Sequence, residues 1–176
     1  MILDWMRTTV LLITLAIAVR QDLRSRRIPN ELIVPAAMAA LFLAMMLDGG
    51  IGLWQTLFGG LLGFLCFLPL YLLRVMGAGD VKLMTVVGML VGPGRIIPVL
   101  LAVFVAGGVL ALGVALREHA VGRLLGNLRG MGWKILLRLA GHAESADEKP
   151  RQSVGQMPYA VAIAAGTLFW VFAGTS

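Results

Sequence analysis

The sequence predicts an all-α polytopic membrane protein of about six transmembrane helices, and three observations lead to this fold class. Hydrophobic residues make up 59% of the 176 residues, charged residues make up 14%, and the mean hydropathy is +0.90. Soluble domains are about 45–50% apolar and about 25% charged, so this composition excludes a soluble globule and a disordered chain. The apolar residues form long runs, and most basic residues gather in alternate loops between them.

Six apolar segments account for the expected spans, because one crossing of the hydrocarbon takes about 20 residues. They lie at 6–20, 31–47, 53–73, 83–92, 96–116 and 157–173. The fourth segment is too short to cross by itself, so we expect its helix to begin earlier, near Gly79. The turn sequence Gly92-Pro93-Gly94-Arg95 joins it to the fifth segment in a helical hairpin. One domain then occupies residues 1–176.

The basic residues set the orientation of these spans. With the N-terminus outside, every Lys and Arg except Arg7 and Arg95 falls in a cytosolic loop, as the positive-inside rule requires. The last cytosolic loop, 117–156, predicts either an interfacial amphipathic helix or a solvated basic loop. For the first segment, a signal peptide cleaved after Ala18 is the alternative. We therefore expect a multi-pass protein of the bacterial cytoplasmic membrane, with membrane lipids around it.

Other classes of site find little support in the sequence. The basic residues lie between apolar runs rather than on one soluble face, which argues against a nucleic-acid partner. Cys66 is the single cysteine and excludes both a disulfide framework and a multi-cysteine zinc site. His119 and His142 have no partners at the spacing of metal ligands. We therefore expect no metal and no cofactor.

Two acidic residues lie at the cytosolic ends of spans, where a carboxylate is costly and functional roles are the default hypothesis. They are Asp22 and Asp80, and the orientation places both on the same side of the membrane. Two carboxylates held close together share a proton, which is the chemistry of aspartic proteases. The alternative is structural: Asp22 pairs with a neighbouring arginine, and Asp80 caps the next helix.

The neighbouring residues have candidate supporting roles. Gly77 and Gly79 leave room for a peptide to approach Asp80. Lys82 either tunes the pair of acids, contacts substrate, or is an interfacial lysine whose charged end reaches water. Pro29 and Asn30 end one segment and begin the next, with Asn30 as the expected N-cap. Pro158 and Tyr159 are candidate cleft or interface residues. Four glycines are candidate sites of close helix packing: Gly59, Gly63, Gly88 and Gly92.

Three blocks of sequence resemble the type IV prepilin peptidase family, the membrane aspartyl peptidases of the GxGD class. The first block is Asp22 with the downstream Ile28-Pro29-Asn30. The second is Gly77-Ala78-Gly79-Asp80-Val81-Lys82-Leu83, which fits the family pattern G-x-G-D-x-K-L. The third, Met157 to Gly166, is similar to the family's Pro-aromatic opening of the last span, although Ala160 stands where the family commonly has Gly. The resemblance is to the small, peptidase-only branch that serves Tad/Flp-type pili.

The resemblance implies an aspartic endopeptidase with Asp22 and Asp80 as its catalytic pair. The implied reaction removes the basic leader from a prepilin-like substrate at the cytosolic membrane face, so the implied partner is the substrate's transmembrane helix. Larger members carry paired CxxC motifs and a methyltransferase activity, which this chain is not expected to have. Pseudopilins or preflagellins are alternative substrates. A small proton-coupled transporter, with the two acids as relay groups, is the alternative from another class.

Overall fold

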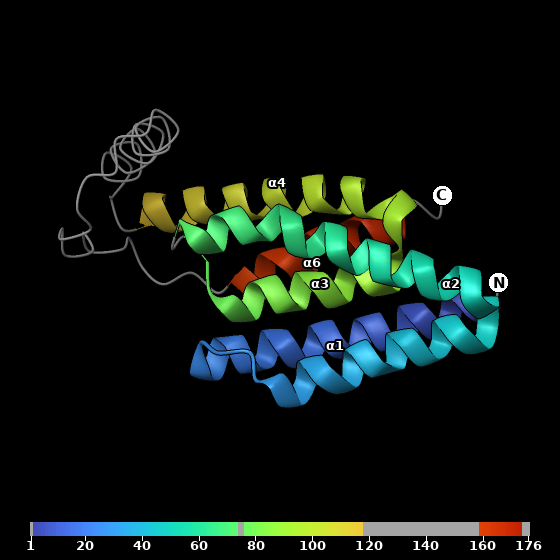
Figure 1. The fold of residues 1–176 in the computed structure, drawn as a ribbon. Coiled ribbons are helices and arrows are strands. Elements are labelled where there is room, and N and C mark those ends of the chain that lie inside the picture. The colour runs from blue at the N-terminus through green and yellow to red at the C-terminus, as the bar shows by residue number, and fades with distance from the viewer. Residues whose placement is uncertain (1, 74–75, 118–158, 174–176) are drawn as a thin grey trace, which may run out of the picture. The chain divides into compact units, whose positions relative to one another are not determined.

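The computed structural model describes residues 2–73, 76–117 and 159–173, and all the regular elements in these ranges are helices (Figure 1). This confirms the expected all-α class. The chain divides into two units, Met1–Gly107 with Pro158–Ser176, and Gly108–Met157. The candidate site lies entirely in the first unit. The expected amphipathic helix of the last loop falls outside the described residues.

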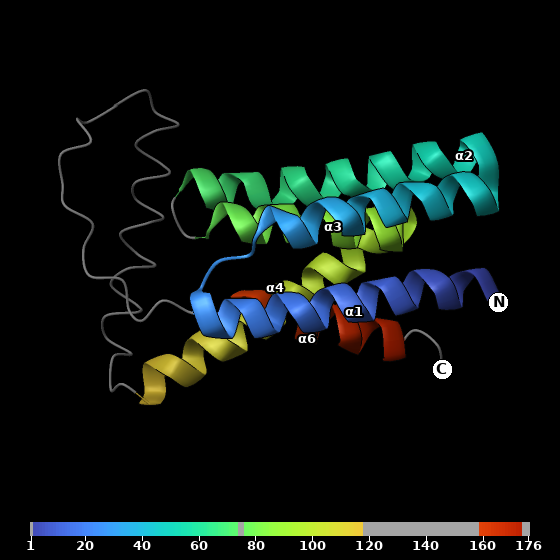
Figure 2. The same cartoon turned by 90° about the horizontal axis from the view of Figure 1, so that it is seen from below.

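The first two elements are α1 (Ile2–Ser25) and α2 (Asn30–Leu72). Gly49 interrupts α2 with φ 61° and ψ −147°, and the chain reverses there, so that its two halves run back along each other (Figures 1 and 2). A residue with a side chain rarely adopts this left-handed conformation, whereas glycine does so at little cost. The halves, 30–48 and 50–72, correspond to the second and third expected segments.

The next elements are α3 (Ala78–Val91), α4 (Pro93–Arg117) and α6 (Tyr159–Ala173). Helix α3 begins at Ala78, which confirms the prediction that the fourth segment starts before its apolar run. A single residue, Gly92 with φ 82°, joins α3 to α4. The predicted turn between the fourth and fifth segments is therefore present, and it uses the left-handed conformation that glycine permits.

Helix α3 lies at the centre of the packing, where it contacts α1, α2 and α6. Most of its residues after Gly79 are buried, with Lys82 as the exposed exception. Gly59 of α2 and Gly88 of α3 meet backbone to backbone, and a Cβ at either position would collide with the carbonyl oxygen of the other. The predicted close packing at these two glycines is confirmed, and it occurs within one chain.

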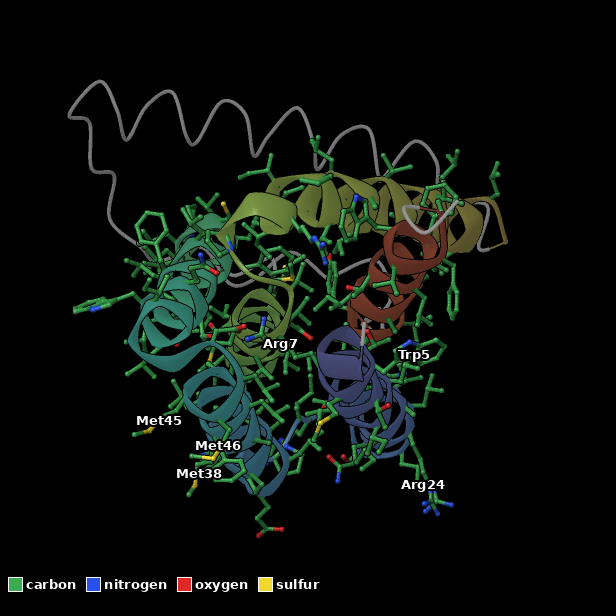
Figure 3. The ribbon with its side chains drawn as sticks, turned by 90° about the vertical axis from the view of Figure 1, so that its right-hand side faces the viewer. Trp5, Arg7, Arg24, Met38, Met45 and Met46 are labelled. Carbon is green, nitrogen blue, oxygen red and sulfur yellow. The ribbon has the colours of Figure 1, made fainter. Side chains whose placement is uncertain are left out.

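Large apolar side chains are exposed on the outer faces of the helices. Met38, Met45 and Met46 point away from the helices on the first half of α2 (Figure 3), and each is more than 60% exposed. Trp54 and Phe169, on α2 and α6, are even more exposed. An apolar surface of this extent is typical of a face that meets lipid rather than water.

Two described helices are long and apolar enough to cross a membrane, Asn30–Leu72 and Pro93–Val114. Because Gly49 reverses the first of them, it contains two of the expected segments. Helices α3 and α6 are shorter than one full crossing. Membrane association is supported, while the number of crossings and their orientation stay predictions.

The reversals bring the helix ends together at two levels. Arg7 of α1 pairs with Asp48 beside the Gly49 turn, which fixes the start of α1 to the far end of the α2 hairpin. At the opposite end, on the left of Figure 1, α1 ends and α2, α3 and α6 begin. Because Asp22 and Asp80 lie at these last ends, the helix directions alone bring the two carboxylates to one level.

Candidate active site

Asp22 lies on the buried face of α1. Leu11, Leu15 and Ala18 are buried at spacings of three and four residues, and Asp22 is the next position on the same face. Its side chain is 7% exposed. The backbone carbonyl of Asp22 accepts the N–H of Arg26 at 2.9 Å, and Arg26 adopts a left-handed φ of 52° that ends the helix. The carboxylate therefore lies in the last full turn of α1, at the edge of the core.

Asp80 lies in the first turn of α3, where it is 8% exposed. Its Oδ2 accepts the N–H of Gly77 at 3.1 Å, and its own N–H donates to the Gly77 carbonyl, also at 3.1 Å. These reciprocal hydrogen bonds satisfy backbone groups that a helix start leaves unpaired. The expectation that Asp80 caps the helix is thus confirmed, and the cap holds the carboxylate in one orientation.

A third helix contributes to the site through its backbone. The N–H of Ala160, in the first turn of α6, donates to Oδ2 of Asp22 at 3.1 Å. The positive end of the α6 dipole also faces this carboxylate. The hydrogen bond described for the Asp22 carboxylate comes from α6. This contact brings Ala160, which belongs to the third sequence block, to the site.

The two carboxylates are close enough to interact electrostatically, because the charge of Asp22 acts on Asp80. Each has one oxygen held by a backbone N–H, and each retains a small exposed fraction through which water has access. Two carboxylates that lie close together can share one proton between them. This arrangement can supply a general base and a general acid at the same place.

The Ile28–Asn30 block packs against the start of α3. A Cβ at Gly79 would lie 3.0 Å from the Cβ of Ile28, so the absence of a side chain at Gly79 lets the two backbones approach. Lys82 donates from Nζ to Oδ1 of Asn30 at 2.8 Å. Two of the three sequence blocks are therefore in direct contact.

The expected N-cap role of Asn30 is wrong. Helix α2 begins at Asn30, the N-cap position falls on Pro29, and no side chain caps the helix there. The reason is that the Asn30 side chain accepts a hydrogen bond from Lys82, and Pro29 has the extended backbone of a residue that precedes a helix.

Tyr159 is the first residue of α6 and is half-buried, and the charge of Asp80 acts on it. It therefore lies within electrostatic range of the carboxylates, which is compatible with its expected place in the cleft. Pro158 lies outside the described residues. The sequence does not predict the role of the Ala160 N–H, because every residue except proline has a backbone N–H. The Pro-aromatic start of the last span was the one available signal.

Metal binding has no geometric basis in the described part of the chain. No group of three or more His, Cys, Asp or Glu residues able to hold an ion occurs there. Asp22 and Asp80 alone make an incomplete ligand set for most protein-bound cations.

Comparison with known proteins gives one match. The sequence model of the type IV leader peptidase family matches residues 9–112, a range that includes Asp22, Asp80 and the Ile28–Asn30 block but ends before α6. Neither a search of curated proteins nor a search of solved structures returned a significant match.

Proposed function

Since the chain belongs to the type IV leader peptidase family, we propose that it is a membrane-embedded aspartic endopeptidase with Asp22 and Asp80 as its catalytic pair. Family membership already implies a protease. The proposal adds the catalytic groups, the substrate and the side of the membrane on which cleavage occurs.

One observation carries the assignment of the catalytic pair. Two buried carboxylates, far apart in sequence, lie at the same end of the helices and interact electrostatically. Burying a carboxylate is costly unless it is paired or hydrogen-bonded, and each of these has a dedicated backbone donor. One such acid could be a helix cap, as Asp80 partly is. Two acids that converge from α1 and α3 favour a shared chemical role.

The proposed reaction uses a water molecule between the two carboxylates. The ionised carboxylate takes a proton from the water molecule while the water oxygen attacks the carbonyl carbon of the peptide bond. The protonated carboxyl group gives its proton to the carbonyl oxygen. The tetrahedral intermediate then collapses and the C–N bond breaks. The leaving nitrogen takes the proton from the carboxyl that received it from water, and a hydroxyl group of the intermediate returns a proton to the other carboxylate. The products are the carboxylate of the leader and the amino terminus of the mature chain, and the pair again shares one proton.

The proposed substrate is a prepilin-like protein with a basic leader followed by an apolar segment. Its apolar segment would stay in lipid beside the exposed apolar faces of the helices, while the bond before that segment reaches the carboxylates at the helix ends. The basic loops support a cytosolic position for this end of the protein. We propose cleavage without methylation of the product, in the bacterial cytoplasmic membrane.

Co-expression with a tagged prepilin tests this proposal. The wild-type protein should remove the leader, which a gel shift and mass spectrometry of the product detect. Asp22→Asn and Asp80→Asn keep the size of each side chain and should leave the precursor intact. If the wild type and both variants process the precursor equally, the two residues are not catalytic. If the wild type also leaves every prepilin intact, a non-proteolytic role such as proton transfer would be favoured instead.

A further inference from the structure

We propose that Lys82 and Asn30 form a positioning pair that fixes the end of α1 relative to the start of α3, and so sets the separation of Asp22 from Asp80. The inference rests on the proposed function, because it concerns the geometry of that catalytic pair. Lys82 then acts on catalysis through Asn30, without touching either carboxylate or the substrate.

The contacts that support this role lie between residues 28–30, which follow Asp22, and residues 79–82, which include Asp80. Lys82 donates from Nζ to Oδ1 of Asn30 at 2.8 Å, a charge-assisted hydrogen bond. Beside it, Ile28 lies against Gly79 at the distance of a tight contact. The two contacts join the segment 28–30 to the segment 79–82 at two points, which restrains both position and rotation.

The connection from Asp22 to this contact is short and stiff. The Asp22 carbonyl holds the N–H of Arg26, and the chain then runs through three residues to Asn30. One of these is Pro29, whose ring fixes φ, observed at −74°. A displacement of Asn30 from α3 would therefore be transmitted to the last turn of α1, where Asp22 lies.

Lys82 is poorly placed to act on Asp80 directly. Residues two apart on a helix point to nearly opposite sides, and Lys82 is exposed whereas Asp80 is buried. Because the bond to Asn30 is exposed, its loss should have little effect on folding. Catalysis is far more sensitive, since a displacement of about 1 Å at a reacting group can cost roughly 100-fold in rate.

The first experiment measures leader cleavage in proteoliposomes, with a purified tagged prepilin as the probe. Lys82→Met and Asn30→Leu should each lower kcat roughly tenfold with little change in KM, and the double variant should be no slower than either single variant. Asn30→Asp keeps an acceptor for Lys82 and should retain most of the activity. Glu31→Gln, an exposed neutralisation at the next residue, is the matched control and should cleave like the wild type.

The second experiment measures the proximity of positions 22 and 80 and does not depend on catalysis. In a Cys66→Ser background, Asp22→Cys and Asp80→Cys place one thiol at each acid position, and a short bifunctional thiol reagent should cross-link them at a rate that depends on their separation. Adding Lys82→Met should slow this cross-linking several-fold, whereas adding Glu31→Gln should not. The unfolding temperature of each protein in detergent checks that the variants are folded.

The outcomes separate this inference from the proposed function. Equal cross-linking with and without Lys82→Met would overturn the positioning role, as would additive kinetic losses in the double variant. A rise in KM alone would overturn it too, because that pattern indicates substrate contact. If the pair controls cross-linking but the wild type cleaves no prepilin, the positioning role stands and the proposed function fails.

Discussion

At the scale of single residues, the site depends on carboxylates whose hydrogen bonds come from backbone groups. Asp22 accepts the N–H of Ala160, and Asp80 accepts the N–H of Gly77. A backbone donor in the first turn of a helix is rigid and cannot rotate away, so it orients a carboxylate better than a flexible side chain does. Each carboxylate is thereby held in one orientation, and the start of α6 becomes part of the site.

Removing the Ala160 donor should impair catalysis. Proline has no backbone N–H, so Ala160→Pro removes the hydrogen bond to Oδ2 of Asp22. Proline is tolerated in the first turn of a helix, but its ring would also occupy the space of the lost hydrogen atom. We expect leader cleavage to fall at least tenfold. Ala160→Gly keeps the N–H and should cleave within about threefold of the wild type. Similar rates for the proline and glycine variants would mean that this hydrogen bond does not serve the reaction.

Residue type predicted some of this site and not the rest. Asp22 and Asp80 were predictable because acids at the ends of apolar segments are costly and therefore conspicuous. The contact between the Ala160 N–H and Asp22 was not predictable, because every residue except proline has the same backbone donor. The Lys82–Asn30 bond joins residues 52 apart, and its members were proposed separately for other roles. Asn30 was misassigned because the local preference for an N-cap gave way to this tertiary contact.

At the scale of elements, α2 and α3 are held together by glycines that let their backbones meet. Gly59 and Gly88 lie at the crossing, and Gly63 of α2 lies against the backbone of Met84. Helices this close gain dispersion contacts along their length and weak Cα–H···O bonds. The crossing fixes α3 within the first unit, and with it the position of Asp80.

A methyl group at this crossing should destabilise the protein. In Gly88→Ala the Cβ would collide with the carbonyl oxygen of Gly59, which is backbone and cannot rotate away. We expect a loss of about 1–3 kcal/mol in the free energy of unfolding, measured by denaturation in detergent. Gly108→Ala makes the same substitution in α4, where nothing lies within 4 Å, and should be neutral or slightly stabilising. Equal stability of the two variants would argue against the close crossing.

The reversal of α2 makes a second test at this scale. Gly49 has a φ of 61°, whereas Gly50 beside it has no positive φ, and neither has a neighbour that a methyl group would meet. Gly49→Ala should therefore cost roughly 1–2 kcal/mol through backbone strain alone. Gly50→Ala should cost little or nothing. The same denaturation measurement compares them, and a larger loss at Gly50 would contradict the observed turn.

The elements themselves were largely predictable. All six expected apolar segments fall on helices, because long apolar runs in a membrane must satisfy their backbone groups internally. Their ends were less predictable: α1 extends five residues beyond its expected end at 20, so that Asp22 lies within the helix rather than after it. Polar residues at the membrane edge continue a helix without any change in backbone geometry, and hydropathy alone does not detect them.

At the scale of the whole molecule, the sequence predicts one orientation of the spans, and the contacts of the first unit show which helix ends lie together. Arg7 and Asp48 lie together at one end. Asp22, Asn30 and Asp80 lie at the end of α1, the start of α2 and the start of α3, and these helix ends lie together at the opposite end (Figure 1). The positive-inside rule predicts that the second end faces the cytosol. Hydropathy and charge suffice to predict the orientation of the spans. The register of α1 against α3, which brings Asp22 and Asp80 together, depends instead on how the helices pack.

Single cysteines test the orientation. In a Cys66→Ser background, Ile51→Cys lies just after the α2 reversal and Ser25→Cys lies at the end of α1; both positions are exposed. A membrane-impermeant maleimide added outside intact cells should label residue 51 and leave residue 25 unlabelled until the cells are permeabilised. Labelling of residue 25 in intact cells would place the carboxylates on the outer side.

The claim that Asp22 and Asp80 form a single catalytic unit is tested most directly by single-turnover rates of leader cleavage in proteoliposomes. We expect Asp22→Asn and Asp80→Asn each to lower the rate by at least about 1,000-fold, and the double variant to be no slower than either, because residues that act as one unit do not contribute additively. A single variant that retains a rate within tenfold of the wild type, or a double variant slower by the product of the two losses, would contradict the account.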